Sequence, residues 1–100
     1  MEKQTFYKVR HKETGKFWKG GGIKNHIKNR INPDDKNDVL KEAFSNLGKA
    51  YSQKYHIKSA LRHQQEFGEE PELQRILFEE CEIVLYKTTL MAIEDPNDIL

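Results

Sequence analysis

Residues 5–12 alternate between two kinds of side chain, as the residues of a β-strand do. One face would carry Thr5, Tyr7, Val9 and His11, and the other Phe6, Lys8, Arg10 and Lys12. A tight connection over 13–16 follows, in which Gly15 can take the positive φ that closes many short hairpins. Residues 16–19 form the returning strand, and the glycines at 20–22 end it because glycine loses too much backbone entropy to extend a strand. The pattern predicts an N-terminal β-hairpin.

Helical spacing of apolar residues begins after the glycines. Isoleucines recur every four residues and predict a short helix over 23–31, which ends before Pro33 because the residue preceding proline leaves the α region. The clearest helix covers 53–67. Ser52 precedes it as a cap, and Gly68 follows at the position that favours left-handed geometry.

The segment between these helices allows two interpretations. Pro33 and the acids at 34–35 can open a helix, because proline suits the first helical position and acids suit the positive end of the helix dipole. A strand through 40–45 is the alternative, and the apolar spacing up to Leu47 does not decide between them.

The last third of the chain predicts a helix followed by a strand. An acidic, proline-containing start at 69–72 opens a short helix over Leu73, Ile76 and Leu77. β-Branched and aromatic residues then dominate, and their period of two predicts a strand over 82–90. Residues 92–100 are polar and acidic and predict a tail.

These elements predict an α+β fold with one domain over 1–91 and the tail over 92–100. A small antiparallel sheet would contain the N-terminal hairpin, a short strand at 49–52 and the C-terminal strand, packed against one main helix and shorter helices. The expected core residues are Ile57, Ala60, Leu61, Phe67, Leu77, Val84 and Tyr86.

Charge is distributed unevenly along the 100 residues, although the net charge is only +1. Residues 1–33 carry nine basic against two acidic residues, and residues 69–100 carry two basic against nine acidic ones, a balance of +7 at one end and −7 at the other. The gradient favours an anion-binding end if the charges are also segregated in space. Otherwise the two ends neutralise one another or form ordinary solvated faces.

Composition excludes several classes of protein. No apolar run approaches the roughly 18 residues of a membrane span, and the start lacks the apolar stretch of a signal peptide, so we expect neither membrane insertion nor secretion. A single cysteine, Cys81, excludes an internal disulfide and a cysteine-rich zinc module. Cys81 begins the C-terminal strand, where we expect a small buried side chain. We therefore expect a cytoplasmic protein.

Motifs for catalysis, metal binding or cofactor binding are not evident. The lysines that follow glycines, Lys16 and Lys49, do not stand in a phosphate-binding loop motif, and the glycines at 20–22 lack the context of a dinucleotide turn. His56 and His63 are seven residues apart, about 10 Å by helical rise, which is too far for one ion without a third element. We predict no catalytic residue, no metal and no cofactor.

The basic and aromatic residues of the hairpin and the following helix are the sharpest functional feature. Cations next to flat rings suit nucleic-acid binding, because cations neutralise phosphates and rings stack on bases. The predicted binding surface consists of Lys8, Arg10, Lys12, Lys16, Trp18, Lys19, Lys24, Lys28 and Arg30. The alternative for Trp18 is a place in the core with lysines covering its rim.

Three short stretches of this sequence resemble small accessory proteins of tailed bacteriophages, over about half the chain. They are Tyr7-Lys8-Val9-Arg10 before a Thr-Gly turn, Ser45 to Gly48-Lys49-Ala50-Tyr51, and Ile83-Val84-Leu85-Tyr86. The sequence departs from that pattern by extra residues around 32–39. The resemblance implies a setting in the bacterial cytoplasm and assigns no activity or site residue.

Two functions follow as hypotheses. The first is a non-enzymatic, phage-type accessory protein that binds and modulates a host or phage macromolecule, with a protein as the preferred partner. The second is a nucleic-acid-binding module that uses the basic aromatic hairpin. The sequence leaves the oligomeric state open.

Overall fold

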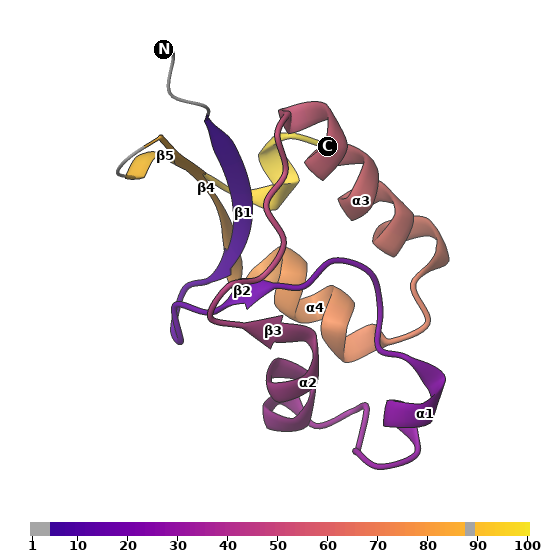
Figure 1. Cartoon of the computed structure of the whole chain (residues 1–100). Helices are drawn as coiled ribbons and strands as arrows, with labels where there is room; N and C mark the ends of the chain where they lie inside the picture. Colours follow the sequence, from indigo (N-terminus) through magenta and orange to yellow (C-terminus); the bar gives the residue numbers. More distant parts are fainter. Residues whose placement is uncertain (1–4, 88–89) are drawn as a thin grey trace.

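A computed structural model describes residues 5–87 and 90–100 of the chain, and Figure 1 shows their arrangement. The elements are β1 (Phe6–His11), β2 (Phe17–Trp18), α1 (Asn25–Lys28), α2 (Lys36–Ala43), β3 (Phe44–Ser45), α3 (Lys54–Phe67), α4 (Pro71–Glu79), β4 (Cys81–Tyr86), β5 (Leu90–Glu94) and the 3₁₀-helix η1 (Pro96–Asp98). The predicted α+β class is confirmed, with an N-terminal hairpin, a C-terminal strand, one main helix and shorter helices around it.

The sheet is antiparallel, with the strand order β3-β2-β1-β4-β5. β1 is its centre, and it pairs over its whole length with β4, from Phe6 opposite Tyr86 to His11 opposite Cys81. The first strand of the chain thus lies beside a strand from its last fifth. On its other edge, β1 pairs with β2 and forms a single β-bridge between Tyr7 and Tyr51. The strand expected at 49–52 is therefore reduced to this one bridge.

The end of the chain differs from the expected single strand and tail. β4 ends at Tyr86, and β5 returns antiparallel beside it, while Thr88 and Thr89 of the expected strand lie outside the described residues. Residues 92–94 belong to β5, and η1 follows with Pro96 buried. The Asn97 side chain donates to the Phe78 carbonyl at 2.7 Å, which ties this segment to α4. The expected tail over 92–100 is therefore part of the folded domain, through strand pairing and the burial of Pro96.

The ambiguous middle segment contains both alternatives in succession. Asp35 caps α2 by accepting a hydrogen bond from the Asp38 backbone N–H at 3.0 Å, and the helix buries Val39, Leu40 and Ala43. Phe44 then turns to extended geometry and begins β3, so a helix and a two-residue strand are joined without a loop. The short helix expected over 23–31 is reduced to α1.

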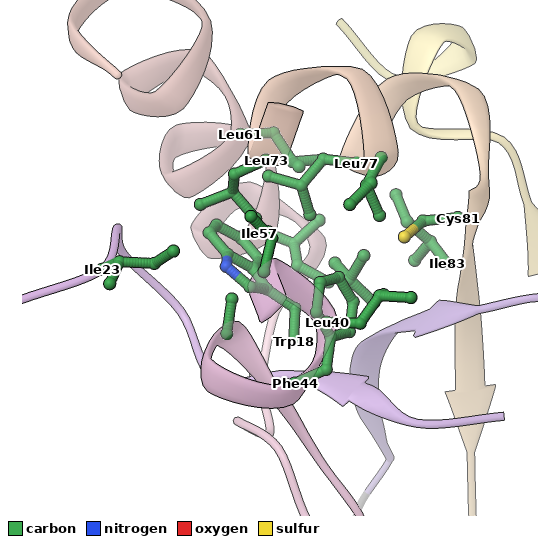
Figure 2. Close-up of a cluster of buried hydrophobic side chains, with 14 of the residues drawn as sticks. Trp18, Ile23, Leu40, Phe44, Ile57, Leu61, Leu73, Leu77, Cys81 and Ile83 are labelled. Atoms are coloured by element: carbon green, nitrogen blue, oxygen red, sulfur yellow. The ribbon is translucent and has the colours of Figure 1, made fainter. Parts of the chain in front are cut away.

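The hydrophobic core lies between the sheet and the helices α2, α3 and α4, and Figure 2 shows its centre. Ile57, Leu61 and Leu77 are buried as expected, and so is Cys81. The expectation is wrong for Phe67, which is 66% exposed: it ends the last turn of α3, where the chain leaves the core, and its ring contacts His63 on the helix surface. Ala60 is only partly buried.

Two glycines show what the backbone requires. Gly15 has φ +73° in the hairpin turn, as predicted. Gly68 was expected to be left-handed, but its φ is −64°, and glycine is needed there because a Cβ would overlap the Gln64 carbonyl oxygen of the preceding turn.

No helix among the described residues is both long enough and apolar enough to cross a membrane.

Candidate interaction surface on the open face of the sheet

Within residues 5–87 and 90–100, the sheet has one face toward the helices and one face without helical cover. Val9 on β1 and Ile83 on β4 are directly opposite one another and belong to the core on the helix side. Because side chains alternate along a strand, their neighbours point to the other face. The pairs on this open face are Phe6 with Tyr86, Lys8 with Val84, and Arg10 with Glu82. Figure 1 shows α3 and α4 on one side of the sheet only.

Three aromatic rings form a cluster at the centre of the open face. Phe6 stacks on Tyr86 with ring centroids 5.4 Å apart, and Phe17 meets Tyr86 edge-on at 6.2 Å. The ammonium group of Lys8 lies 4.7 Å from the centroid of Phe17 and 5.8 Å from that of Phe6. Such contacts stabilise a cation beside the rings by about 0.5–1 kcal/mol at exposed sites.

Val84 shows how much this cluster covers. Its side chain is fully buried although it points away from the helices and lies outside the helix-side core. The open face therefore also contains a buried apolar side chain. The expected core position of Val84 is confirmed, whereas Tyr86 is half-buried and forms part of this surface.

Exposed aliphatic side chains extend the surface around the rings. Ile93 on β5 is opposite Val84 and is 53% exposed. Leu47, which follows β3, is 78% exposed, and its carbonyl accepts a hydrogen bond from Lys8. We call Phe6, Lys8, Phe17, Tyr86 and Ile93 the open-face patch. A contiguous apolar patch on a small protein is characteristic of an interaction site.

Trp18 does not belong to an accessible surface, which corrects its assignment to the binding residues. It is 1% exposed, and its indole N–H donates to the Gly21 carbonyl at 3.0 Å. Trp18 is opposite Phe44 in the sheet, and both side chains are part of the core (Figure 2). The alternative interpretation, burial of the single tryptophan, is therefore correct, because a small core needs its large side chains.

Apart from Lys8, which lies beside the aromatic rings, the predicted basic residues divide into two groups. Arg10 and Lys28 are paired with acids: Arg10 binds Glu82 at 2.6 Å, and Lys28 binds Glu69 at 3.2 Å and Glu70 at 3.0 Å. Among the described residues, the other group forms no ion pair and is exposed. It consists of Lys12, Lys16, Lys19, Lys24 and Arg30.

The charges at the two ends of the chain are not segregated in space. The partners of Arg10 and Lys28 are acids from the last third of the sequence, since β1 pairs with β4 and α1 lies near the start of α4. Lys54 likewise binds Glu94. Of the alternatives that the sequence left open, neutralisation of one end by the other therefore holds for Arg10 and Lys28, because antiparallel pairing places the first strand beside the acidic end.

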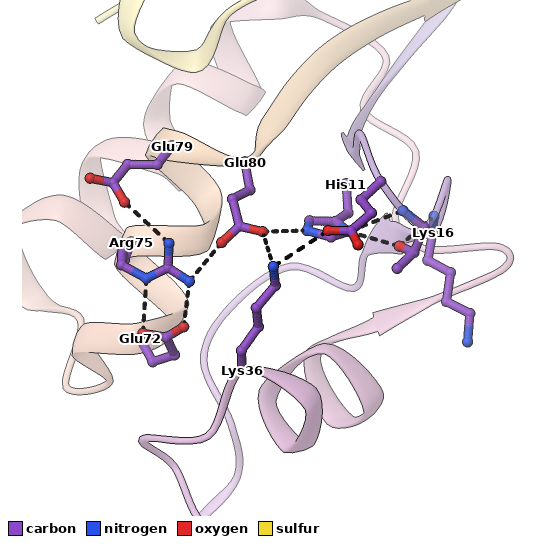
Figure 3. Close-up of polar contacts among 9 residues, drawn as sticks. His11, Lys16, Lys36, Glu72, Arg75, Glu79 and Glu80 are labelled. Carbon is purple, nitrogen blue, oxygen red and sulfur yellow. Dashed lines mark hydrogen bonds and ion pairs between the residues drawn. The ribbon is translucent and has the colours of Figure 1, made fainter.

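A polar network lies at the opposite end of β1 from Phe6, and Figure 3 shows it. Glu80, which follows α4, accepts from His11 Nε2 at 3.0 Å, from Lys36 Nζ at 2.8 Å and from Arg75 at 2.6 Å. Burial alone would raise the pKa of the Glu80 carboxyl, but the hydrogen bonds from Lys36, His11 and Arg75 outweigh it and lower the pKa to about 2. The carboxylate joins β1, α2 and α4.

His11 is completely buried, and its two ring nitrogens have different partners. Nδ1 lies 2.9 Å from the Thr14 hydroxyl and accepts the Thr14 backbone N–H at 3.3 Å, so Nε2 is the nitrogen that donates to Glu80. Hydroxyl, imidazole and carboxylate in this order are also the parts of a catalytic triad. Here the imidazole is enclosed by the hairpin turn that it holds, and its contacts serve to tie this turn to α4.

His11, Glu13 and Glu80 have ligand atoms within 4.8 Å of one another, close enough to hold a metal ion. The Lys36 ammonium group already lies 2.8 Å from Glu80 and 3.4 Å from Glu13. It therefore supplies at this point the positive charge that an ion would bring.

Cys81 has no nucleophilic character in this fold. Burial raises the pKa of its thiol to about 12, so the thiolate is not formed at neutral pH.

The residues that sequence reasoning missed are Phe17, Ile93 and the surface position of Tyr86. The alternation of Glu82, Val84 and Tyr86 was the available signal, since an acidic residue in that series marks the face turned to solvent.

Comparison with protein-family models, with curated proteins and with solved structures finds no match for this chain.

Proposed function

We propose that this chain is a non-enzymatic binding protein whose open-face patch docks on a partner protein. One observation carries the proposal: three aromatic rings and exposed aliphatic side chains lie together on a sheet face that no helix covers. The cores of protein interfaces are rich in aromatic side chains and poor in charged ones, and the patch has this composition.

The margin of the patch indicates the chemistry of the partner. Lys12 follows β1, and Lys16 and Lys19 flank β2; all three are exposed and free of ion pairs within the described part of the chain. A partner surface with an apolar centre and acidic margins would complement this arrangement. The resemblance to phage accessory proteins supplies the setting, in which the partner is a host or phage protein of the bacterial cytoplasm.

The internal saturation of the polar network supports binding over catalysis. The hydrogen bonds of His11 and Glu80 are made to the hairpin turn, to α2 and to α4, and His11 has no exposed surface. A general base must reach the proton that it abstracts, and these groups are directed to structural partners.

Affinity capture from bacterial lysate with nuclease treatment, followed by titration of the purified candidate, tests the proposal. Replacing Phe6 by Ser and Ile93 by Lys removes two apolar members of the patch and should weaken binding at least tenfold, although loss of the Phe6–Tyr86 stacking also lowers thermal stability. Ile93→Lys alone, at a side chain that is 53% exposed, should weaken binding with little change in thermal stability. Phe67→Ser is the control, because Phe67 is also a phenylalanine at the surface but lies on α3; it is 66% exposed, whereas Phe6 is half-buried. Equal affinity of both variants for the captured protein would refute docking through the patch.

Nucleic acid is the second candidate ligand. The position of Lys8 beside the rings of Phe6 and Phe17 favours it, because a cation next to a stacking platform is what single-stranded nucleic acid requires. The pairing of Arg10 and the burial of Trp18 reduce the available surface.

Fluorescence anisotropy with random single-stranded DNA and RNA distinguishes the two candidates. We expect no affinity at about 50 mM salt if the patch binds protein. An affinity whose logarithm falls steeply with the logarithm of salt concentration, and that Phe17→Ser abolishes, would establish nucleic acid instead.

A further inference from the structure

A cavity of about 380 Å³ lies on the helix side of the molecule, between α3 and the segment that precedes it. Tyr51 is opposite Tyr7 across a β-bridge, and Tyr7 packs against the helix-side core, so Tyr51 is on the same side. The cavity is thus separate from the open-face patch, and none of its residues serves the proposed docking.

The lining of this cavity is cationic and rich in hydrogen-bond donors. Apart from two alanines it consists of Lys49, Tyr51, Ser52, His56, Ser59 and His63. None of the lining residues is acidic, and its Lys49 forms no ion pair with any described residue. Lysine ammonium groups and serine hydroxyls are donors that suit an oxyanion.

Two other cavities that contain a lysine show a contrast. The cavity around Lys28 contains Glu69 and Glu70, and both carboxylates bind that lysine. The cavity beside Lys54 contains Glu94, which is again bound to the lysine. In both places the protein supplies its own anion, whereas at Lys49 it supplies none.

Tyr51 adds a buried donor without a partner. Its side chain is 5% exposed, and its hydroxyl has no hydrogen-bond partner among the described residues. Burial raises the pKa of this phenol to about 12, so the hydroxyl keeps its proton at neutral pH. A buried hydroxyl without a hydrogen-bond partner destabilises a protein by about 1–3 kcal/mol. The presence of tyrosine at this position therefore calls for an explanation.

The hydroxyl and the lysine converge at one place. A Cβ added to Gly20 would lie 3.2 Å from the Tyr51 hydroxyl and 2.9 Å from Cδ of Lys49. The Lys49 ammonium group lies 5.2 Å from the centroid of the Tyr51 ring. The exposed side chain of Lys49 and the unpartnered hydroxyl of Tyr51 therefore lie near the same point of the backbone, and both residues line this cavity.

We propose that this cavity binds a phosphate-class oxyanion, either free phosphate or the phosphate group of a small monoester. Lys49 supplies the charge, and the hydroxyls of Ser52 and Ser59 and the imidazole of His56 belong to the same lining as hydrogen-bonding groups. The oxyanion also gives the Tyr51 hydroxyl an acceptor. The site is independent of the docking function proposed above.

Titration of the full chain with inorganic phosphate, followed by ¹H–¹⁵N NMR, tests this site. We expect saturable shifts confined to the amides of 49–52 and of α3 around His56, and none with sodium chloride at equal ionic strength. Lys49→Gln should weaken phosphate binding roughly tenfold or more, the loss expected for one charged hydrogen bond. Lys41→Gln, which replaces an exposed lysine on α2, is the matched control and should leave the titration unchanged.

A second variant separates binding from folding. Tyr51→Phe removes only the unpartnered hydroxyl, so the protein should fold at least as well while phosphate binds more weakly. Adenosine monophosphate as a second probe distinguishes the sources: tighter binding than phosphate identifies a monoester, and weaker or equal binding identifies the free ion. Identical titrations of the wild type and Lys49→Gln, or the same shifts with chloride, would overturn the proposal.

Discussion

Single residues in this protein take roles that their type alone does not decide. Trp18 and Phe17 are neighbours in a two-residue strand, yet one is buried in the core and the other lies on the open face. Alternation predicts that they differ and does not predict which one is inside. The partner strand settles this, because Trp18 is opposite Phe44, which is itself buried under α2.

Glu80 is the residue whose protonation should affect stability most clearly. Its pKa in the folded protein is about 2, below the ordinary value, so the ionised carboxylate stabilises the fold above about pH 4.5. This contribution is lost as the pH falls from about 4.5 toward 2, because protonation breaks the contacts with Lys36 and Arg75. Glu80→Gln should cost about 1–2 kcal/mol at pH 7 after allowance for solvent screening, and nearly nothing at pH 2.

Urea unfolding at several pH values measures this effect. Glu79→Gln is the control, because Glu79 is the adjacent residue but is mostly exposed and contacts Arg75 alone at 3.3 Å. A difference between wild type and Glu80→Gln that stays constant from pH 7 to pH 2 would contradict a stabilising role of the charge.

At the scale of elements, local signals predicted the helices better than the strands. The helix over 53–67 and the helix that begins at Pro71 agree with α3 and α4, because apolar periodicity and an initial proline act within one or two turns. The expected cap is wrong: Gln53 and not Ser52 is the N-cap of α3, and its side chain makes no cap hydrogen bond. The pairing of β1 with β4 depends on residues about seventy positions apart, which no local pattern encodes. α2 and β3 were ambiguous because the chain changes from helix to strand at Phe44 without a turn residue.

Gly48 determines how β3 is connected to the rest of the sheet. It has φ +61°, and a Cβ there would overlap Cβ of Phe17 and lie 3.0 Å from the Trp18 carbonyl oxygen. We expect Gly48→Ala to destabilise the protein by more than about 2 kcal/mol, from left-handed strain together with the overlap.

Gly21→Ala is the matched variant for this measurement. Gly21 also has a positive φ, +71°, but a Cβ there would meet no atom within 4 Å. Thermal or chemical unfolding should therefore show only the conformational cost of about 1–2 kcal/mol at Gly21. Equal losses at the two glycines would mean that the close approach of Gly48 to β2 contributes nothing.

At the scale of the whole molecule, the end of the chain completes the structure. Pro96 is buried, Ile99 and Leu100 pack against the core, and residues 92–94 pair with β4. Truncation after Met91 should therefore lower stability by more than about 2 kcal/mol, the value of burying one large apolar side chain. Circular dichroism on heating measures this loss. An unchanged melting temperature would restore the interpretation of 92–100 as a tail.

The sequence by itself determined the class of the fold, the N-terminal hairpin and the main helices, because these depend on turn residues and periodicities within a few positions. Tertiary structure alone decided which aromatic residues are accessible and how charges are compensated. Side-chain exposure depends on what packs opposite, and ion pairs form between residues far apart in the chain, such as Arg10 and Glu82. For that reason the candidate surface retains Lys8 from the predicted set and exchanges Trp18 for Phe17 and Tyr86, while Arg10 and Lys28 are paired with acids from the end of the chain.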